Sequence, residues 1–519
     1  MFEGVFMHSD VGRSSEMSLR PAKRESNVRT WISQSLLVTL VLAAGIYWRF
    51  SPWLPKVFYG DDLYNIVATL KDHVFVGTWQ SALTSEFYEK YRPVFHLAWF
   101  ALAQIFHTDL RGFLAFDFFL QLASGVVFFS IAMQLSNRNR FVSLALAFTF
   151  ATSRFALYQA TQATGMVEAL ALLFFLLAVT VLLKSLTQPE RGALQWVIVG
   201  LYFLCVHSHE RYIAVAPWLA TAMAMTGFRR SGGFVNRFGG AIAILAIPLL
   251  NILIKTTLLH SAFFVGTGAT HLDINIARIV DLSEQAVFSV FGFNYGPQHL
   301  VGHSIVFGDN EPGDALSRVI ATIATIAVAI AALWSVVVGR KQHAARQSYL
   351  LFAIALVVLL LAPPVLTIRV EQRWMYAPFA VLLAILAWST RLDGRKVWVP
   401  VIASLVACAS LLALDTRLSA FFPRIYLSYA ATASEIAKRD LVDAHAAPVG
   451  GDLLLQISAD NCRWTFIEGR FFELYEGKPR NLTCYTDSKE LPALRQQHPS
   501  ARAFIYTPGV SFTPAPGNK

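Results

Sequence analysis

The sequence predicts an all-α polytopic membrane protein with a small C-terminal α/β domain. Of 519 residues, 55% are hydrophobic and only 15% are charged, with a mean hydropathy of +0.49. A water-soluble chain of this size does not carry so much apolar surface. The apolar residues form runs of roughly 16 to 25, the length of a spanning helix, and not the roughly ten-residue alternation of an outer-membrane barrel. Fibrous, disordered and small disulfide-rich classes are excluded.

The net charge of +10 would favour a polyanion-binding surface in a soluble protein. Here the basic residues lie mostly in short loops between apolar runs, so they indicate topology and not nucleic-acid binding. Residues 1–30 form a basic N-terminus, and the apolar run that follows has no small-residue cleavage site. We therefore expect an uncleaved first span and a cytoplasmic N-terminus.

About eleven apolar runs are long enough to be transmembrane helices within residues 31–414. The predicted spans are approximately residues 32–50, 112–135, 141–156, 168–184, 193–208, 211–227, 237–258, 314–338, 348–368, 373–390 and 397–414.

The run 93–107 is shorter, about 15 residues, and fits either a short span or an interfacial helix. If it is interfacial, all five later basic loops lie in the cytoplasm, as the positive-inside rule requires. If it is a span, all five lie outside while the basic N-terminus stays inside. We therefore predict an interfacial helix, with 51–111 and 259–313 as outer loops and 415–519 as an extracytoplasmic domain.

Residues 415–519 have the pattern of a small α/β domain. Residues 426–439 read as a helix, and 452–458 and 503–506 read as strands. Of four cysteines, only Cys462 and Cys484 lie in this polar stretch, so they are the only candidates for a disulfide.

Charged and polar residues collect at the outer ends of the predicted spans, where charge is costly unless water or a partner solvates it. The cytoplasmic loops carry basic residues but no comparable mixture. The outer set is Asp61 and Asp62; Tyr91 and Arg92; Arg154 and Glu168; His207, His209, Glu210 and Arg211; and Arg369, Glu371 and Arg373.

Asp61 and Asp62 carry the clearest chemical signal of this set. Two adjacent carboxylates repel each other, so a cation or a donor must hold one ionised while the other titrates higher. A carboxylate at a membrane surface, aimed at a hydroxyl, is what general-base catalysis requires. The alternative is structural, because an apolar helical pattern begins at Leu63 and the pair would serve as helix cap and first-turn acid.

The arginines of the outer set also allow two interpretations. Arg92 and Arg373 stand beside aromatic residues and can simply snorkel to the membrane surface. With Arg211 and Arg369, they could instead converge on a phosphate headgroup. Glu168 fits a salt bridge as well as catalysis or metal binding. His207, His209 and Glu210 show no recognised zinc spacing, and phosphate loops, nucleotide fingerprints and serine-hydrolase elbows are absent.

The set resembles the glycosyltransferase C superfamily, multi-span enzymes that transfer sugars from polyprenyl-phosphate carriers on the outer side of a membrane. The resemblance covers roughly residues 30–390. An acidic pair in the first outer loop is matched by Asp61 and Asp62, followed by interfacial helices at 93–107. The tyrosine-basic-proline signature of protein mannosyltransferases and aminoarabinose transferases is matched by Tyr91, Arg92 and Pro93.

Three further elements follow in order. Glu168 matches an acidic residue of the second outer loop, and His209 with Glu210 matches in part a Lys-Glu pair after the fifth span. Arg373, Tyr376 and Pro378 match an Arg-aromatic-x-Tyr-x-Pro element late in the chain.

The resemblance implies a polyprenyl-phosphate-sugar-dependent glycosyltransferase. Asp61 would be the base that deprotonates an acceptor hydroxyl, and Asp62 would orient it or share a metal. Glu168 would bind the sugar, the acceptor or a divalent ion. Direct displacement would invert the anomeric centre. No cofactor is certain, since dependence on a divalent metal varies within the superfamily.

The remaining site residues would bind the substrate or the lipid phosphate, and among them Arg92, Arg211 and Arg373, with Tyr376, would hold the phosphate and stabilise the charge that develops as it leaves. The remaining site residues are Tyr91, Arg92, His209, Glu210, Arg211, Glu371, Arg373 and Tyr376.

The expected partners are the polyprenyl-linked donor, a glycan, lipid or protein acceptor, and the bilayer of a bacterial cytoplasmic (inner) membrane, with no nucleic acid. Three rivals remain. A flippase or transporter would place charges at mid-span, and an oligosaccharide polymerase or ligase would place its functional residues in a late outer loop. A purely structural subunit would tolerate Asp61→Asn. The sequence leaves the sugar, the acceptor and the oligomeric state open.

Overall fold

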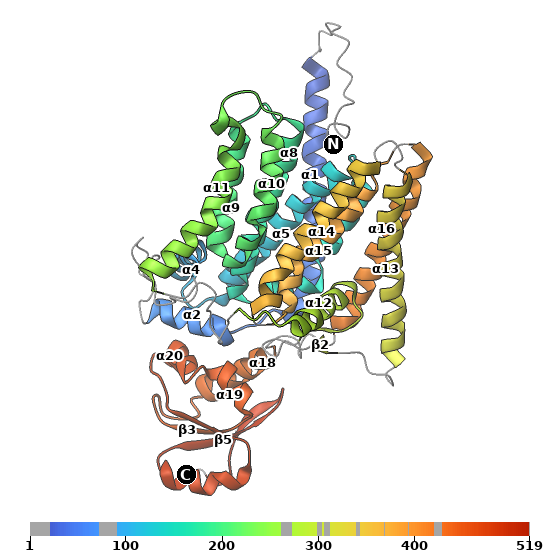
Figure 1. The fold of residues 1–519 in the computed structure, drawn as a ribbon. Coiled ribbons are helices and arrows are strands. Elements are labelled where there is room, and N and C mark those ends of the chain that lie inside the picture. The colour runs from blue at the N-terminus through green and yellow to red at the C-terminus, as the bar shows by residue number, and fades with distance from the viewer. Residues whose placement is uncertain are drawn as a thin grey trace.

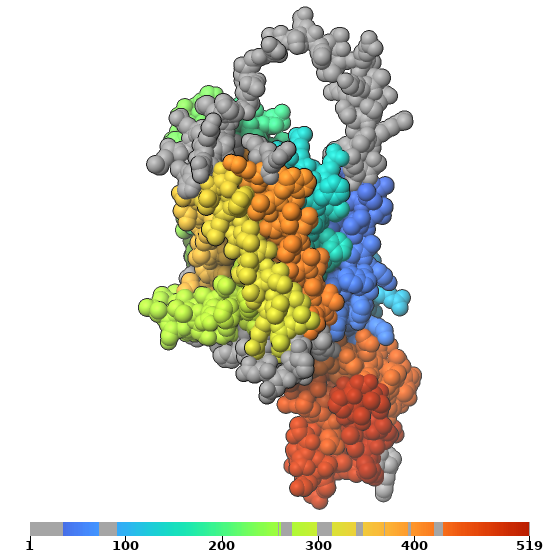
Figure 2. Space-filling model, turned by 90° about the vertical axis from the view of Figure 1, so that its right-hand side faces the viewer, coloured from blue at the N-terminus to red at the C-terminus, as the bar shows by residue number. Residues whose placement is uncertain are grey.

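The computed structural model shows a bundle of helices with a small domain beneath one end (Figure 1). Helix α1 (Pro21–Phe50) begins at the opposite end of the bundle, and the C-terminal domain projects from the lower end (Figures 1 and 2). The structure describes residues 21–71, 91–260, 272–297, 304–305, 312–338, 343–367, 369–392, 394–419 and 428–517.

Within these residues, seven helices are long and apolar enough to cross a membrane. A pair of helices, Arg140–Ala151 and Arg154–Thr161, bent by 44° at their junction, would make an eighth span. This agrees with a polytopic helical membrane protein. The seven helices are α1, α5 (Leu110–Leu135), α8 (Met166–Thr187), α11 (Phe234–Leu253), α13 (Pro312–Val338), α14 (His343–Thr367) and α16 (Trp398–Leu418). The spans of α1, α8 and α11 also include an adjoining short turn.

The predicted count of eleven spans is not confirmed, because three of the predicted helices are short. Helix α9 (Ala193–Ser208) has 16 residues, α10 (Ala216–Gly227) has 12 and α15 (Tyr376–Ser389) has 14. The 3-10 turns η5 (Glu210–Val215) and η8 (Gln372–Met375) precede α10 and α15 and take up residues that the apolar pattern counts as helix. All three short helices nevertheless lie alongside the longer ones (Figure 1).

The first predicted outer loop contains two helices. The predicted helix 93–107 is present as α4 (Pro93–Phe106), and α2 (Gly60–Leu70) lies across the end of the bundle (Figure 1). Residues 72–90 of this loop lie outside the described residues. In the second predicted outer loop, α12 (Ile276–Phe291) lies crosswise beside the lower part of the bundle (Figures 1 and 2). There, β1 (Gly296–Pro297) pairs with β2 (Ser304–Ile305).

The C-terminal domain is built on a four-stranded sheet of order β4-β3-β5-β6. The predicted strands are confirmed as β3 (Leu453–Gln456) and β5 (Arg502–Thr507), which run parallel with Leu455 opposite Phe504. The predicted helix corresponds to α18 (Ser428–Ala437). The other elements of this domain are β4 (Leu482–Tyr485), β6 (Ser511–Pro514), α19 (Ala459–Phe466), α20 (Arg470–Glu476) and α21 (Leu491–Gln497).

Two further helices belong to the bundle, α6 (Arg140–Ala151) and α7 (Leu157–Thr161).

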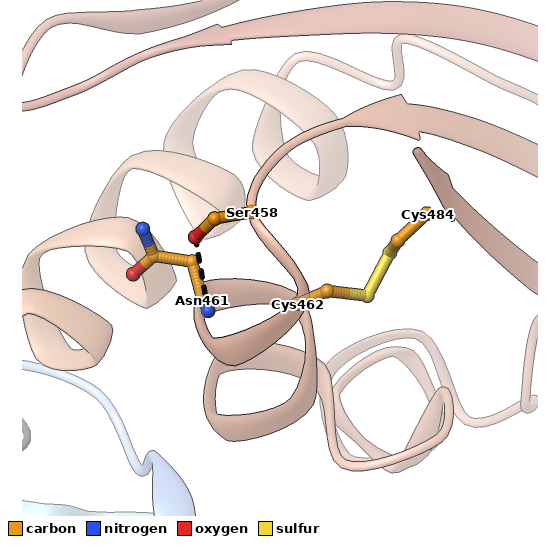
Figure 3. Close-up of a disulfide and its surroundings, with 4 residues drawn as sticks. All are labelled: Ser458, Asn461, Cys462 and Cys484. Atoms are coloured by element: carbon orange, nitrogen blue, oxygen red, sulfur yellow. Dashed lines mark hydrogen bonds between the residues drawn. A yellow bond between two sulfur atoms is a disulfide. The ribbon is translucent and has the colours of Figure 1, made fainter. Parts of the chain in front are cut away.

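A disulfide joins Cys462 at the start of α19 to Cys484 on β4, across 22 positions of sequence (Figure 3). The Ser458 hydroxyl accepts a hydrogen bond from the Asn461 backbone N–H and caps α19 beside it (Figure 3). Helix and sheet of the domain are thereby held together covalently.

The core of the C-terminal domain continues into the first outer loop. One apolar cluster contains Phe466 and Phe472 of the domain together with Phe58, Trp99 and Phe113 of the bundle. Leu63, Ile66 and Val67 of α2 belong to the same cluster. Because buried aromatic side chains contribute strongly to packing, this cluster holds α2 between the bundle and the domain.

Candidate functional site

Helix α2 presents Asp61 and Asp62 differently. Asp62 is 1% exposed, and its carboxylate accepts hydrogen bonds from the Ala163 N–H (2.9 Å), the Thr164 N–H (2.8 Å) and the Thr164 hydroxyl (2.6 Å). Asp61 is exposed. Neighbouring helical residues point about 100° apart, so one carboxylate faces the protein while the other faces outward. Asp62 therefore anchors α2 and sets the direction of Asp61.

The anchoring turn depends on close backbone packing. A Cβ at Gly165 would lie 2.4 Å from the Tyr158 carbonyl oxygen, so only glycine fits. Burial raises the pKa of Asp62 to about 6, although the donors from Thr164 and Ala163 oppose the shift. Asp62 is thus held by neutral donors and not by a cation.

Glu168, in the first turn of α8, is the centre of a second cluster. One carboxylate oxygen accepts from Trp374 Nε1 (3.0 Å) and lies 3.1 Å from His209 Nε2, and the other accepts from Arg211 Nη2 (2.7 Å). Its side chain is 1% exposed. Three donors from η5, η8 and the turn before η5 therefore share one buried carboxylate.

His209 is neutral in this arrangement. Its Nδ1 accepts from the Arg211 N–H (3.2 Å), which assigns the proton to Nε2, where it points to Glu168. Burial lowers the pKa of His209, against the opposing effect of Glu168. The histidine thus orients Glu168 and the backbone of η5.

Arg92 and Glu210 form a bidentate ion pair, with Nε donating at 2.6 Å and Nη2 at 2.8 Å. Burial alone would raise the pKa of Glu210, but the Arg92 guanidinium outweighs it and holds the pKa of that carboxyl well below its usual range. The pair fixes the start of α4 to the start of η5.

The third cluster follows α14. Glu371 is 1% exposed and lies 2.7 Å from the guanidinium nitrogens of both Arg369 and Arg373. The Arg373 guanidinium stacks on the Tyr158 ring at 4.3 Å, and it interacts electrostatically with Asp61 and Glu168. Arg373 therefore connects the two carboxylate clusters to the exposed Asp61.

These clusters form one connected set at the end of the bundle nearest the C-terminal domain, which we call the polar layer. Each arginine is anchored by a carboxylate, yet the Arg92 and Arg373 side chains keep 14% and 16% exposure. Nη1 of Arg211 has no hydrogen-bond partner within the described part of the chain. The polar layer comprises Asp61, Asp62, Arg92, Glu168, His209, Glu210, Arg211, Arg369, Glu371 and Arg373.

Two predicted site residues lie apart from this layer. Tyr376 is buried in the bundle core, where its hydroxyl donates to the Phe150 carbonyl (3.2 Å) and accepts from Gln121 (2.6 Å). The Tyr91 ring is buried edge-on against His207 at 5.7 Å. Both side chains have packing roles, so we do not place them at the phosphate.

Sequence reasoning missed residues that complete the site. Trp374, between two singled-out positions, donates to Glu168, and Thr164 holds Asp62. Asp117 on α5 is fully buried, interacts electrostatically with Asp62, and has no hydrogen-bond partner within the described part of the chain. A carboxylate inside the apolar run 112–135 is the signal that would have identified Asp117.

No group of three or more His, Cys, Asp or Glu side chains within the described ranges is arranged to hold a metal ion. Asp62 and Glu168, both considered as ligands from sequence, have their oxygens engaged by the donors described above. We therefore assign neither of them to a metal.

Comparisons with known proteins add no identification: no protein-family model and no curated protein matches this chain.

Proposed function

We propose that the protein is a membrane glycosyltransferase that moves a sugar from a polyprenyl-phosphate carrier to an acceptor hydroxyl on the extracytoplasmic face. The observation that carries the proposal is the exposed carboxylate of Asp61 within electrostatic reach of the partly exposed guanidinium of Arg373, at one end of an apolar helical bundle. A base and a cation at a membrane surface suit an acceptor proton and a leaving phosphate.

In the proposed reaction, Asp61 takes the proton of the acceptor hydroxyl, and the acceptor oxygen attacks the anomeric carbon. The bond from that carbon to the phosphate oxygen breaks, and the electron pair leaves on the polyprenyl phosphate. Arg92, Arg211 and Arg373 bind that phosphate, since planar guanidinium groups match its oxygens. Backside displacement inverts the anomeric centre.

The carboxylates of the polar layer are positioning residues in this scheme. Glu168, Glu210 and Glu371 each hold an arginine within 2.7 Å, so the guanidinium groups are oriented before the donor arrives. Preorganised charges cost no reorganisation during the reaction. In this scheme the N–H groups that bind the phosphate are those of Arg211 Nη1, which has no hydrogen-bond partner in the described part of the chain, and those of the exposed parts of the Arg92 and Arg373 guanidinium groups.

The topology that accompanies this proposal has about eleven spans, with the short helices α9, α10 and α15 completing the bundle. The N-terminus lies in the cytoplasm and the polar layer and C-terminal domain lie outside, in a bacterial cytoplasmic membrane. The basic loops and the opposite ends of α1 and the C-terminal domain support this orientation (Figure 1).

The test is mass spectrometry of membrane lipids from cells that carry wild type, a deletion, or Asp61→Asn at wild-type level. Glu284→Gln, at an exposed position on α12 near the same end of the bundle, is the matched control. We expect the polyprenyl-phosphate sugar to accumulate and the glycosylated product to disappear in the deletion and in Asp61→Asn only, which would also name the sugar. A wild-type lipid profile in Asp61→Asn, with a changed one in the deletion, would instead favour a ligase or a flippase.

A further inference from the structure

A second feature lies in the half of the bundle away from the polar layer. Helices α8, α10, α14 and α15 enclose an apolar groove of about 210 Å³, with α5 at its back. Its lining on α8 begins at Phe175, well beyond the first turn that carries Glu168, and ends at Leu186. The groove is therefore separate from the site proposed above.

The groove has the length of one leaflet. At a rise of about 1.5 Å per residue, the lining from Phe175 to Leu186 spans roughly 17 Å. The hydrocarbon of one leaflet is about half of roughly 30 Å. A single acyl chain that follows the groove would thus stay within the leaflet opposite the polar layer.

Two of the walls are joined by an aromatic contact. Trp218 of α10 donates through Nε1 to the Phe352 carbonyl of α14 (2.9 Å), and the two rings stack at 4.7 Å. Trp388 near the C-terminal end of α15 and Tyr349 near the N-terminal end of α14 stack at 6.3 Å, and both line the groove. The aromatic contacts keep the walls in place and leave an apolar channel between them.

The rim of the groove is basic. Arg229 is the charged residue of the described lining, and no acidic residue belongs to that lining. The Arg346 guanidinium lies 5.5 Å from the Trp388 ring, and both Arg229 and Arg391 interact electrostatically with Tyr349. Arg229 of the lining and Arg346, against Trp388 of that lining, therefore lie at one end of an apolar channel, which fits a molecule with one anionic end and one hydrocarbon end.

We propose that this groove binds an anionic glycerophospholipid, with one acyl chain between α8, α10, α14 and α15 and the phosphate at Arg229 and Arg346. Helix α10 follows the turn that carries Arg211, and α15 follows the turn that carries Arg373. The bound lipid therefore braces the two helices that support the polar layer. This proposal does not depend on the transferase assignment.

The experiment measures phospholipid retained by the purified full-length protein, by mass spectrometry, and its thermal stabilisation by phosphatidylglycerol or phosphatidylcholine in detergent micelles. Ala353→Phe fills the groove, and Ala355→Phe places the same side chain on the exposed face of the same helix. Arg229→Gln removes a rim charge, and Arg237→Gln removes an exposed basic residue in the first turn of α11, just beyond the same loop.

We expect wild type to retain anionic lipid and to be stabilised by phosphatidylglycerol only. Ala353→Phe should lose this lipid, and Arg229→Gln should bind it about five-fold more weakly, the factor for one basic residue at an anionic surface. Both controls should match wild type. Equal effects of the two phospholipids, equal retention in Ala353→Phe and Ala355→Phe, or retained polyprenyl phosphate would each overturn the proposal. If Ala353→Phe does not fold, the retained phospholipid is measured in Ala353→Leu and Arg229→Gln instead, and wild-type retention in both would overturn the proposal.

Discussion

The helical bundle and the C-terminal domain use charged residues in different ways. Between the spanning helices of the bundle, one ion pair is fully buried: the Arg154 and Asp415 side chains, 2.6 Å apart, are 1% and 4% exposed. In the domain, Lys438–Asp443 and Arg439–Asp440 lie at the surface, with Arg480–Glu476 as a buried exception. A buried pair repays its desolvation only when geometry and additional hydrogen bonds are good, so the bundle's charges are costly and fixed in place. The domain relies instead on an apolar core and a disulfide.

The largest expected effect tests the buried charges of the bundle. Glu168→Gln removes the negative charge that faces Arg211 and His209, and it leaves a buried guanidinium uncompensated. We expect the free energy of unfolding to fall by about 3 to 5 kcal/mol. Chemical unfolding in mixed micelles measures it, with the exposed Glu284→Gln as control. A loss below about 1 kcal/mol would show that the ion pair of Glu168 contributes no more to stability than the surface ion pairs of the domain.

The second prediction concerns the domain. Replacing both Cys462 and Cys484 by serine opens a loop of 22 positions, and we expect the domain to lose about 3 kcal/mol of stability. Hydrogen exchange of residues 428–517 in the full chain reports it, while exchange in α5 and α8 should change little. Dithiothreitol should reproduce the effect in wild type and add nothing in the double variant. Equal destabilisation of bundle and domain would remove the distinction between them.

The third prediction uses pH to measure the contribution of Asp62 to the free energy of unfolding. The hydrogen-bond donors to Asp62 are neutral. Its folded-state pKa of about 6 lies above the ordinary 3.8. The folded protein thus retains a proton that the unfolded chain releases, so the Asp62 contribution favours folding at low pH and declines as pH rises through about 6. Relative to Asp62→Asn, wild type should gain about 2 kcal/mol of stability from pH 7 to pH 4.5. A difference that does not vary with pH would contradict the buried, cation-free environment of Asp62.

The smallest effect is expected where bundle and domain meet. Lys56 lies 3.5 Å from Glu435, but its side chain is 83% exposed. Lys56→Ala should change the free energy of unfolding by less than about 1 kcal/mol. The contact between the regions depends on aromatic packing around Phe58, whose N–H also donates to the Tyr475 hydroxyl (3.0 Å). A larger loss in Lys56→Ala than in Tyr475→Phe would show that charge holds the domain in place.

The sequence predicts the class of protein because apolar run length follows directly from bilayer thickness. It also groups Glu168, Arg211 and Arg373 correctly at one end of the bundle, since charges avoid the apolar interior. It does not predict the turns η5 and η8, which shorten α10 and α15, because those turns are stabilised by hydrogen bonds from Arg211 and Trp374 to Glu168 on α8.

The division of roles between Asp61 and Asp62 is likewise invisible in the sequence. Both carry the same side chain in the same helical turn, and the donors of Ala163 and Thr164, about 100 residues away, decide which carboxylate is buried. Strand β4 was missed because its pattern is short and its partner β3 is distant in sequence. Long-range partners, and not local propensity, determine these features.

The most direct test of the central claim compares Asp61→Asn and Asp62→Asn in purified protein, by transfer from extracted polyprenyl-phosphate sugar and by unfolding midpoint. We predict that Asp61→Asn lowers the transfer rate by about 10² to 10⁴-fold with an unchanged midpoint, as for loss of a general base. Asp62→Asn should alter the midpoint. Transfer by Asp61→Asn at the rate of the Glu284→Gln control would show that Asp61 is not the catalytic base.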